Sequence, residues 1–124
     1  MENDFNTDED TFDLINDTLK KNHTSVKFGL SLDDETIYLE SLEVLKNKRG
    51  QGLGTAFMSE LCSLCDNYGY YIDVSPSADD NDELEDDETY NRLVAFYQKF
   101  DFDVTSEEDG YMSRSPKSQN NLKM

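Results

Sequence analysis

The stretch Lys48-Arg49-Gly50-Gln51-Gly52-Leu53-Gly54-Thr55 lies between two apolar segments of different periodicity, 37–45 and 55–68. The first segment is typical of a strand, and the second has apolar residues at helical spacing. A strand that leads through glycines into a helix presents unpaired backbone N–H groups at the positive end of the helix dipole, and glycine lets an anion approach them closely. We therefore interpret the stretch as a candidate phosphate-binding loop, with a glycine-rich turn that binds no ligand as the alternative.

The spacing of the glycines does not fit the common nucleotide-binding loops. A Walker loop needs Lys-Ser or Lys-Thr directly after its last glycine, but Gly54 is followed by Thr55-Ala56. A dinucleotide-binding loop needs glycines at G-x-G-x-x-G spacing, whereas the glycines here alternate. Arg49-x-x-Gly52-x-Gly54 instead resembles the pyrophosphate-binding motif, Gln/Arg-x-x-Gly-x-Gly/Ala, of the GNAT superfamily of N-acetyltransferases, which bind acetyl-coenzyme A.

The net charge restricts the partners of the chain. The 124 residues suit one small domain, and 28 acidic against 11 basic residues give a formal net charge of -17. Such a chain repels the phosphates of nucleic acids and anionic membrane surfaces, so we expect neither nucleic acid nor membrane as a direct partner. A cationic partner is expected instead. An acidic protein that mimics DNA and blocks a basic or DNA-binding partner is the alternative.

The composition also bears on location and metal binding. No apolar run approaches the length of a membrane span, and the acidic segment 1–10 does not resemble a signal peptide. We expect a cytoplasmic protein, in the host cytoplasm if a virus encodes it.

Cys62 and Cys65 form a single C-x-x-C within a predicted helix, and His23 is the only histidine. This is too few ligands for a zinc site, so we expect no metal, two buried reduced thiols, and a solvent-exposed or helix-capping histidine.

Hydrophobic periodicity predicts helices and strands along the chain. The predicted elements are, in order, a helix ending near Lys21, strands at 26–32 and 37–45, a helix at 55–68, a strand at 70–74, a helix from about Thr89, and strands at 102–105 and 111–113. Alternation slips at Glu40-Ser41, which predicts a β-bulge or a splay near there because a one-residue slip would otherwise expose the buried face. The strand, loop, helix and strand around the glycines predict a parallel β-α-β unit.

A second motif lies in the C-terminal half. Phe96-Tyr97-x-Lys99-x-Asp101-Phe102, followed by Met112-x-Arg114, resembles the end of a GNAT domain, where a helix ends in Phe-Tyr-x-Lys-x-Gly-Phe and a hairpin ends in Met-x-Arg. Asp101 replaces the glycine of that pattern, and aspartate tolerates the left-handed turn better than most residues. The resemblance covers 26–114, and Ile72-x-Val74-x-Pro76-Ser77 with Arg92-Leu93 is similar to compact acetyltransferases of bacteria and their viruses.

The resemblance implies an α/β fold, with a GNAT-like mixed, splayed β-sheet flanked by helices and a truncated N-terminal part. We expect an acetyltransferase domain at 11–114 between an acidic disordered tail at 1–10 and a disordered tail at 115–124. Within the domain, 77–89 forms an acidic loop, either simply solvated or attracting a basic partner.

The resemblance also implies direct transfer of an acetyl group from acetyl-coenzyme A to an amine. The residues that it assigns to the cosubstrate are Leu42, Val44, Arg49, Gly50, Gln51, Gly52, Leu53, Gly54 and Thr55. Tyr97 matches the tyrosine that protonates the departing thiolate, although it also fits a core aromatic. Glu40 and Glu43 are candidate bases or ordinary strand residues, and Asp73 and Ser75 are candidates for the acceptor groove.

The acceptor implied by the charge is a basic protein or peptide, or a small polyamine-like amine. A homodimer is a further expectation, because the short N-terminal part would leave apolar surface exposed. Two alternatives keep the fold without catalysis: an acidic protein that inhibits a basic partner, and a sensor that binds acetyl-coenzyme A without turnover.

Overall fold

The computed structural model describes residues 7–75, 87–106 and 111–117. A five-stranded sheet has the order β1-β2-β3-β5-β4. The elements are, in chain order, α1 (Thr7–Asn22), β1 (Val26–Asp33), β2 (Thr36–Val44), the 3-10 helix η2 (Lys46–Lys48), α2 (Leu53–Tyr68), β3 (Tyr71–Val74), α3 (Asp87–Gln98), β4 (Asp103–Ser106) and β5 (Tyr111–Arg114). The predicted mixed α/β sheet flanked by helices is confirmed, because β2 and β3 pair in parallel and the other neighbours are antiparallel.

A β-bulge in β2 keeps the apolar residues on one face of the sheet. Gly29 pairs with Ser41 and Leu30 pairs with Leu39, so Glu40 is the extra residue. The bulge predicted at Glu40-Ser41 is confirmed. It returns Leu42 and the residues after it to the face that carries Leu39, because one inserted residue reverses the alternation of a strand.

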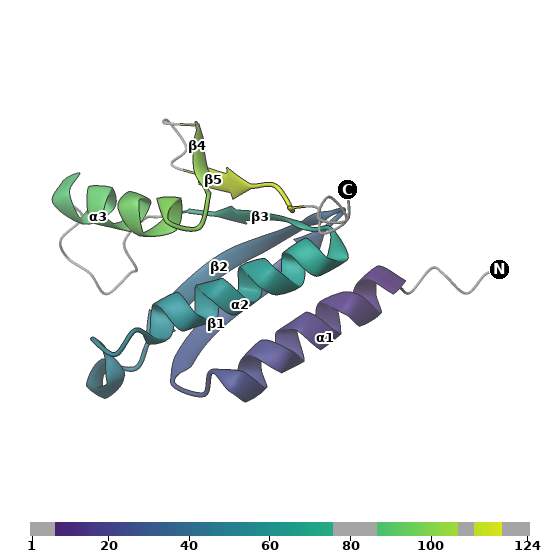
Figure 1. Ribbon diagram of the computed structural model, residues 1–124, viewed down its shortest axis with the longest axis horizontal. Coiled ribbons are helices and arrows are strands. Elements are labelled where there is room, and N and C mark those ends of the chain that lie inside the picture. Colours follow the sequence, from purple (N-terminus) through teal and green to yellow (C-terminus); the bar gives the residue numbers. More distant parts are fainter. Residues whose placement is uncertain (1–6, 76–86, 107–110, 118–124) are drawn as a thin grey trace, which may run out of the picture.

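That face is covered by helices. Figure 1 shows α1 and α2 side by side across β1 and β2, with α3 beside β3 and the β4–β5 hairpin. The core contains fully buried side chains from α1 (Ile15, Leu19), α2 (Phe57, Leu61, Cys65), and the strands (Ile37, Ile72, Met112). Burial of such side chains contributes roughly 1.5–3 kcal/mol each to the free energy of folding, and it fixes the helices against one side of the sheet.

The parallel ladder between β2 and β3 is short. It runs from Thr36 opposite Tyr71 to Leu39 opposite Val74, and β2 then continues to Val44. Beyond Leu39, β2 therefore has no ladder partner on its β3 side among the described residues. The two central strands part at the level of the bulge.

Several element boundaries differ from those predicted, most of them by one or two residues; α2, for example, begins at Leu53 rather than at Thr55. Helix α1 begins at Thr7, so 7–10 belong to a helix rather than to a tail, and α3 begins at Asp87 rather than near Thr89. Residues 115–117 are ordered against the domain, since the Lys117 N–H donates to Asp66 Oδ1 at 2.9 Å. The rest of the predicted tails, 1–6 and 118–124, and most of the acidic loop, 76–86, lie outside the described residues.

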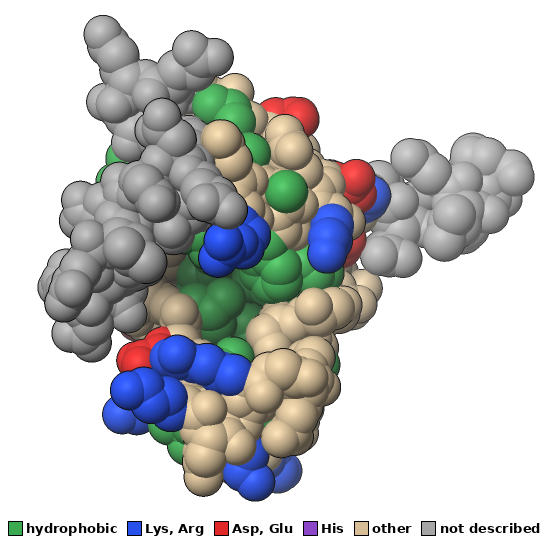
Figure 2. Space-filling view, turned by 90° about the vertical axis from the view of Figure 1, so that its left-hand side faces the viewer, with side chains coloured by type: hydrophobic (Ala, Val, Ile, Leu, Met, Phe, Trp, Pro, Cys, Tyr) green, Lys and Arg blue, Asp and Glu red, His purple; other side chains and the backbone are tan. Residues whose placement is uncertain are grey.

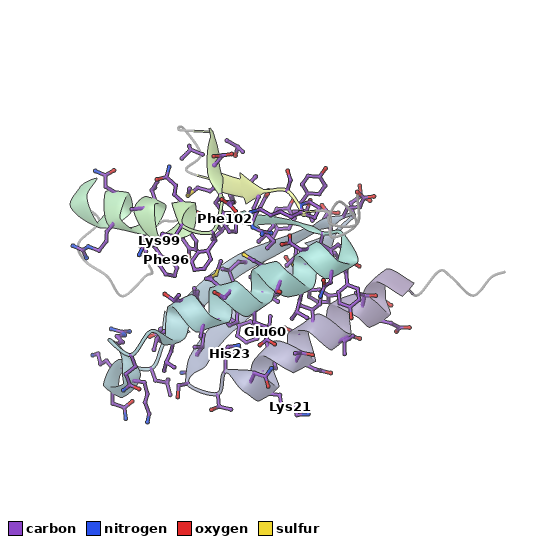
Figure 3. The ribbon with its side chains drawn as sticks, viewed as in Figure 1. Lys21, His23, Glu60, Phe96, Lys99 and Phe102 are labelled. Carbon is purple, nitrogen blue, oxygen red and sulfur yellow. The ribbon has the colours of Figure 1, made fainter. Side chains whose placement is uncertain are left out.

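Two local predictions are tested at single residues. Asp101 has φ 73°, which confirms the left-handed turn expected at that position. His23 is not a solvent-exposed turn residue: its side chain is 12% exposed, and Nε2 lies 2.8 Å from Glu60 Oε1. Figure 3 shows this pair between the end of α1 and the middle of α2, where it links the two helices.

Candidate active site

The glycine loop joins β2 to α2 in a conformation that depends on its glycines. Gly50 has φ 84° and Gly52 has φ 77°, values that residues with a side chain rarely adopt. A Cβ atom built on either glycine would meet nothing within 4 Å. The space in front of both glycines is therefore open, and glycine is favoured at these positions by the backbone conformation rather than by tight packing.

The start of α2 leaves its amides free. The first hydrogen bond of the helix runs from Ala56 N to Gly52 O at 3.0 Å, and Gly52, the N-cap residue, supplies no side-chain cap. Within the described part of the chain, the N–H groups of 51–55 have no hydrogen-bond acceptor. These donors lie at the positive end of the helix dipole, an arrangement that suits an anion.

Cations surround the same loop. Lys46, Lys48 and Arg49 are exposed, and they are three of the 11 basic residues in a chain of net charge -17. Arg49 Nε donates to Val44 O at 3.0 Å, and its Nη2 lies 3.6 Å from Glu43 Oε2. The guanidinium is thus turned toward the end of β2, and it is still 52% exposed.

Three elements meet beside this loop. A Cβ atom on Gly54 would lie 3.8 Å from Val44 Cγ2 and 3.9 Å from Phe96 Cζ, so the end of β2, the start of α2 and α3 are neighbours here. Figure 2 shows an apolar recess on this side of the molecule, with lysine and arginine side chains on its rims. Figure 3 places Phe96 and Lys99 of α3 above α2. An apolar floor between cationic rims can hold a long ligand that carries phosphates.

Tyr97 is a buried phenol on α3. Its side chain is 6% exposed, and its ring packs edge-on against Phe96 and Phe102, with ring centroids 5.2 and 5.8 Å away. Burial raises the pKa of Tyr97 to about 12, so the hydroxyl keeps its proton at neutral pH. In the described residues the hydroxyl has no hydrogen-bond partner, although buried tyrosine hydroxyls usually have one.

The two candidate bases lie on the other side of β2 from Tyr97. Glu40, at the bulge, is exposed and accepts a hydrogen bond from Ser31 Oγ at 2.6 Å. Glu43 pairs in register with Lys27, on the face away from the helices, and its carboxylate is next to Arg49. The structure therefore groups Leu42, Val44 and the glycine loop with α3, and it separates both carboxylates from Tyr97.

The candidates for the acceptor groove are on β3. Asp73 lies on the face turned away from the helices, and its Oδ1 accepts a hydrogen bond from Ser113 Oγ at 2.6 Å. Ser75, partly exposed, follows the last residue of β3. Both are close to the point where β2 and β3 part.

Sequence reasoning missed the buried ion pair that supports α3. Arg114 is 5% exposed and donates to both oxygens of Asp66, at 2.7 and 2.9 Å, while its Nε donates to Phe100 O at 2.8 Å. Burial alone would raise the pKa of Asp66, but the hydrogen bonds from Arg114 and from the Lys117 N–H outweigh it and lower that pKa. The Met-x-Arg motif was a signal for Arg114, but no spacing in the sequence points to Asp66.

The cysteines are the buried free thiols that were expected. Burial raises the pKa of Cys62 to about 11 and that of Cys65 to about 12. Both thiols are therefore protonated and unreactive at neutral pH.

Among the described residues, no group of three histidine, cysteine, aspartate or glutamate side chains could hold a metal ion, and no helix is long and apolar enough to cross a membrane.

Comparisons with known proteins bear on the fold of the chain. The model of the acetyltransferase (GNAT) family matches residues 19–102, which is more than half of the chain. A comparison with curated protein sequences finds no significant match.

Several solved structures have a similar fold. The anti-CRISPR protein AcrVA5 matches with a TM-score of 0.58 and 19% identity, over 74% of this chain and 92% of that protein. Ard1 from Thermoplasma volcanium matches with a TM-score of 0.50 and 21% identity, over 72% of this chain and 61% of Ard1. Arabidopsis thaliana Naa50, in complex with the bisubstrate analogue CoA-Ac-MVNAL, matches with a TM-score of 0.50 and 19% identity, over 73% of this chain and 63% of Naa50. At these identities, the similarity concerns the fold alone, and this chain spans less than two thirds of the length of Ard1 and Naa50.

Proposed function

Since the chain belongs to the acetyltransferase (GNAT) family, we propose that it transfers an acetyl group from acetyl-coenzyme A to a cationic amine acceptor. The observation that carries the proposal is the row of free N–H groups at 51–55, at the start of α2 and next to three exposed cations. A diphosphate supplies the acceptors and the negative charge that these groups lack.

The loop and the end of β2 would hold the cosubstrate. The N–H groups of Gln51, Gly52, Gly54 and Thr55 would bind the pyrophosphate, with Arg49 adding charge, and the open space at Gly50 and Gly52 leaves room for phosphate oxygens. Beyond Leu39, β2 lacks a ladder partner on its β3 side among the residues described, so its N–H groups at Leu42 and Val44 are available to the pantetheine arm, while Val44 O already accepts from Arg49 Nε. The apolar recess beside Gly54 and Phe96 suits that arm.

In the reaction, the neutral amine nitrogen forms a bond to the acetyl carbon while the bond from that carbon to sulfur breaks. When bound, acetyl-coenzyme A supplies the activated thioester. A carboxylate, Glu40 or Glu43, takes the proton that the acceptor ammonium must lose first. Both lie on the face of β2 opposite Tyr97, so the acceptor would approach from the outer face and the leaving sulfur would lie on the helix side.

Tyr97 would act on the leaving sulfur. Its buried hydroxyl is protonated and has no partner among the described residues, so it can donate a hydrogen bond to a thiolate. Its pKa of about 12 lies above that of an ordinary thiol, which is about 8.5. Tyr97 would therefore stabilise the thiolate chiefly as a hydrogen-bond donor, and solvent would supply the final proton.

Titration calorimetry with acetyl-coenzyme A tests the proposal. We expect saturable heat from the native protein, and loss of binding in a double variant, Arg49→Glu with Gly52→Glu, which places two carboxylates at the phosphate cradle. The matched control is Lys20→Glu with Lys21→Gln, which changes the net charge by the same amount at two lysines exposed on the last turn of α1. Absence of heat at high micromolar ligand, or equal binding by both double variants, would contradict the proposed function.

The net charge of -17 supports one second candidate, an acidic protein that keeps the fold and blocks a basic partner. Such a protein would bind its partner equally well with Arg49→Glu and Gly52→Glu, whereas an enzyme with that double variant would no longer acetylate anything. A sensor would differ from both, since it would bind acetyl-coenzyme A and release no free coenzyme A across a panel of amines.

A further inference from the structure

The face of the sheet turned away from the helices carries tyrosines and carboxylates. Register places one outward row across the strands: Ser31 opposite Tyr38, Tyr38 opposite Asp73, and Asp73 opposite Ser113. No residue of this row is buried, whereas Ile37, Leu39, Ile72 and Val74, on the other face of the same strands, are all buried. We call this surface the outer sheet face.

Three tyrosines expose their rings on the outer sheet face. Tyr71 of β3 is 43% exposed and Tyr111 of β5 is 46% exposed, and Tyr38 of β2 is partly exposed. Tyr111 stands two residues before Ser113 on β5 and is therefore diagonal to Asp73. Partial desolvation, and after it the charges of Asp73 and Asp33, raise the pKa of Tyr38, which agrees with their closeness.

Carboxylates outnumber cations on the outer sheet face: among the described residues, its one lysine or arginine at an outward strand position is Lys27 of β1, opposite Glu43. The outward positions of β2, β3, β4 and β5 carry no lysine or arginine. They carry Glu40 and Asp73, with Asp33 exposed at the end of β1 and Asp103 exposed on β4. Tyrosine rings attract cations through their faces, and carboxylates pair with lysine and arginine, so this surface is complementary to a basic segment.

The outer sheet face borders the place where the central strands part. The Tyr38–Asp73 pair is directly before Leu39–Val74, the last pair of the parallel ladder, and Glu40 follows at the bulge. We propose that the tyrosines and carboxylates of the outer sheet face dock a lysine- and arginine-bearing segment of a protein acceptor, so that one lysine of that segment reaches the opening between β2 and β3. The docking role rests on the proposed acetyl transfer, which supplies the reason for a lysine to be brought there.

Other occupants fit this surface less well. Nucleic acid would bring phosphates against carboxylates. A second copy of the chain, packed face to face, would bring together two surfaces rich in carboxylates, and like charges facing each other are unfavourable. A basic peptide segment meets no such repulsion.

Binding of a short fluorescent peptide of alternating lysine and glycine, followed by anisotropy without acetyl-coenzyme A, tests the docking surface. The site variant combines Asp33→Asn, Asp103→Asn and Tyr111→Ser, and the control variant combines Asp13→Asn and Asp17→Asn, two exposed aspartates of α1. Both variants lose the same net charge. We expect the peptide to bind roughly ten-fold more weakly to the site variant and to change by less than about two-fold with the control, given the usual strength of cation–π and surface ion pairs.

Steady-state kinetics provide the second readout. We expect the site variant to raise the KM for the lysine peptide by a similar factor, with the KM for acetyl-coenzyme A and the rate with a small amine unchanged. The docking role would be overturned by any of three results: equally weakened peptide binding in both variants, no binding of the peptide to the native protein, or a dimer in which the outer sheet face is covered. Because anisotropy needs no turnover, peptide binding that persists in a protein unable to bind acetyl-coenzyme A would instead count against the proposed enzymatic function.

Discussion

Arg114 holds three parts of the molecule together with one side chain. Its guanidinium bonds to Asp66 on α2 and to the carbonyl of Phe100 just after α3, while its backbone belongs to β5. Because Tyr97 is on the last turn of α3, the same contacts set where that phenol lies. The side chains of Arg114 and Asp66 are 5% and 10% exposed, so each would be costly to leave without the other.

Replacement of Arg114 by methionine should therefore lower the free energy of unfolding by about 3 kcal/mol, because it leaves the Asp66 carboxylate buried without its counter-charge. Chemical denaturation at neutral pH measures this loss. The control is Lys117→Met, which removes the exposed ion pair with Asp101 and should cost less than about 1 kcal/mol. Losses of similar size in the two variants would contradict the role of Arg114.

The same pair predicts a pH dependence. The pKa of Asp66 is lower in the folded protein than its ordinary value, so its contribution to stability is complete above that ordinary value and is lost as pH falls through the folded-state pKa. In Arg114→Met this acid-induced loss should be smaller, because the folded-state pKa of Asp66 is no longer held down.

At the scale of single elements, β2 depends on one inserted residue. Glu40 has no partner in the β1 ladder, and by occupying that position it keeps Leu42 and Val44 on the helix side, where Val44 lies next to Gly54. The carboxylate itself makes only an exposed contact, with Ser31. The position matters more to the fold than the charge.

Deletion of Glu40 should consequently be far more harmful than its substitution. Without the inserted residue, Leu42 and Val44 would turn to solvent, with a loss of roughly 2–4 kcal/mol of unfolding free energy and of acetyl-coenzyme A binding. Glu40→Ala keeps the residue count and should change stability by less than about 1 kcal/mol. Denaturant titration of both variants gives the comparison, and a deletion variant as stable as Glu40→Ala would show that the bulge does not set the faces of β2.

The elements were predictable from sequence where periodicity or turn chemistry is local. The slip at Glu40-Ser41 located the bulge, and the alternate glycines located the start of α2. The start of α1 was not found, because Asp8-Glu9-Asp10 has no apolar spacing, although acidic residues are favoured at a helix N-terminus. Tertiary packing could not be predicted in this way, because no local pattern encodes it. It brings Arg114 into contact with Asp66, 48 residues away in sequence, and it separates Glu40 and Glu43 from Tyr97.

At the scale of the whole molecule, the large net negative charge lowers the stability of the folded state. A formal net charge of -17 on 124 residues makes the folded chain repel itself, and the described cations near the glycine loop relieve this only locally. Salt screens such repulsion over distances of about 30 Å at 0.01 M and about 3 Å at 1 M.

Raising sodium chloride from about 0.01 M to about 0.5 M should therefore increase the melting temperature of the protein, and the same change should weaken its binding to a basic peptide. Thermal denaturation and anisotropy on one set of samples measure the two effects. A melting temperature that falls or stays constant with salt would mean that specific ion pairs, rather than net repulsion, dominate the electrostatics of this fold.

The buried cysteines have a practical consequence for any assay of turnover. Cys62 and Cys65 are protonated inside the core, so a colorimetric thiol reagent added to the native protein would react with free coenzyme A and leave the protein uncoloured. Product formation can then be followed continuously in a cuvette, without separation of the reactants. Once the chain unfolds, the same reagent would react with two additional thiols, and the time course of that reaction would report when α2 unfolds.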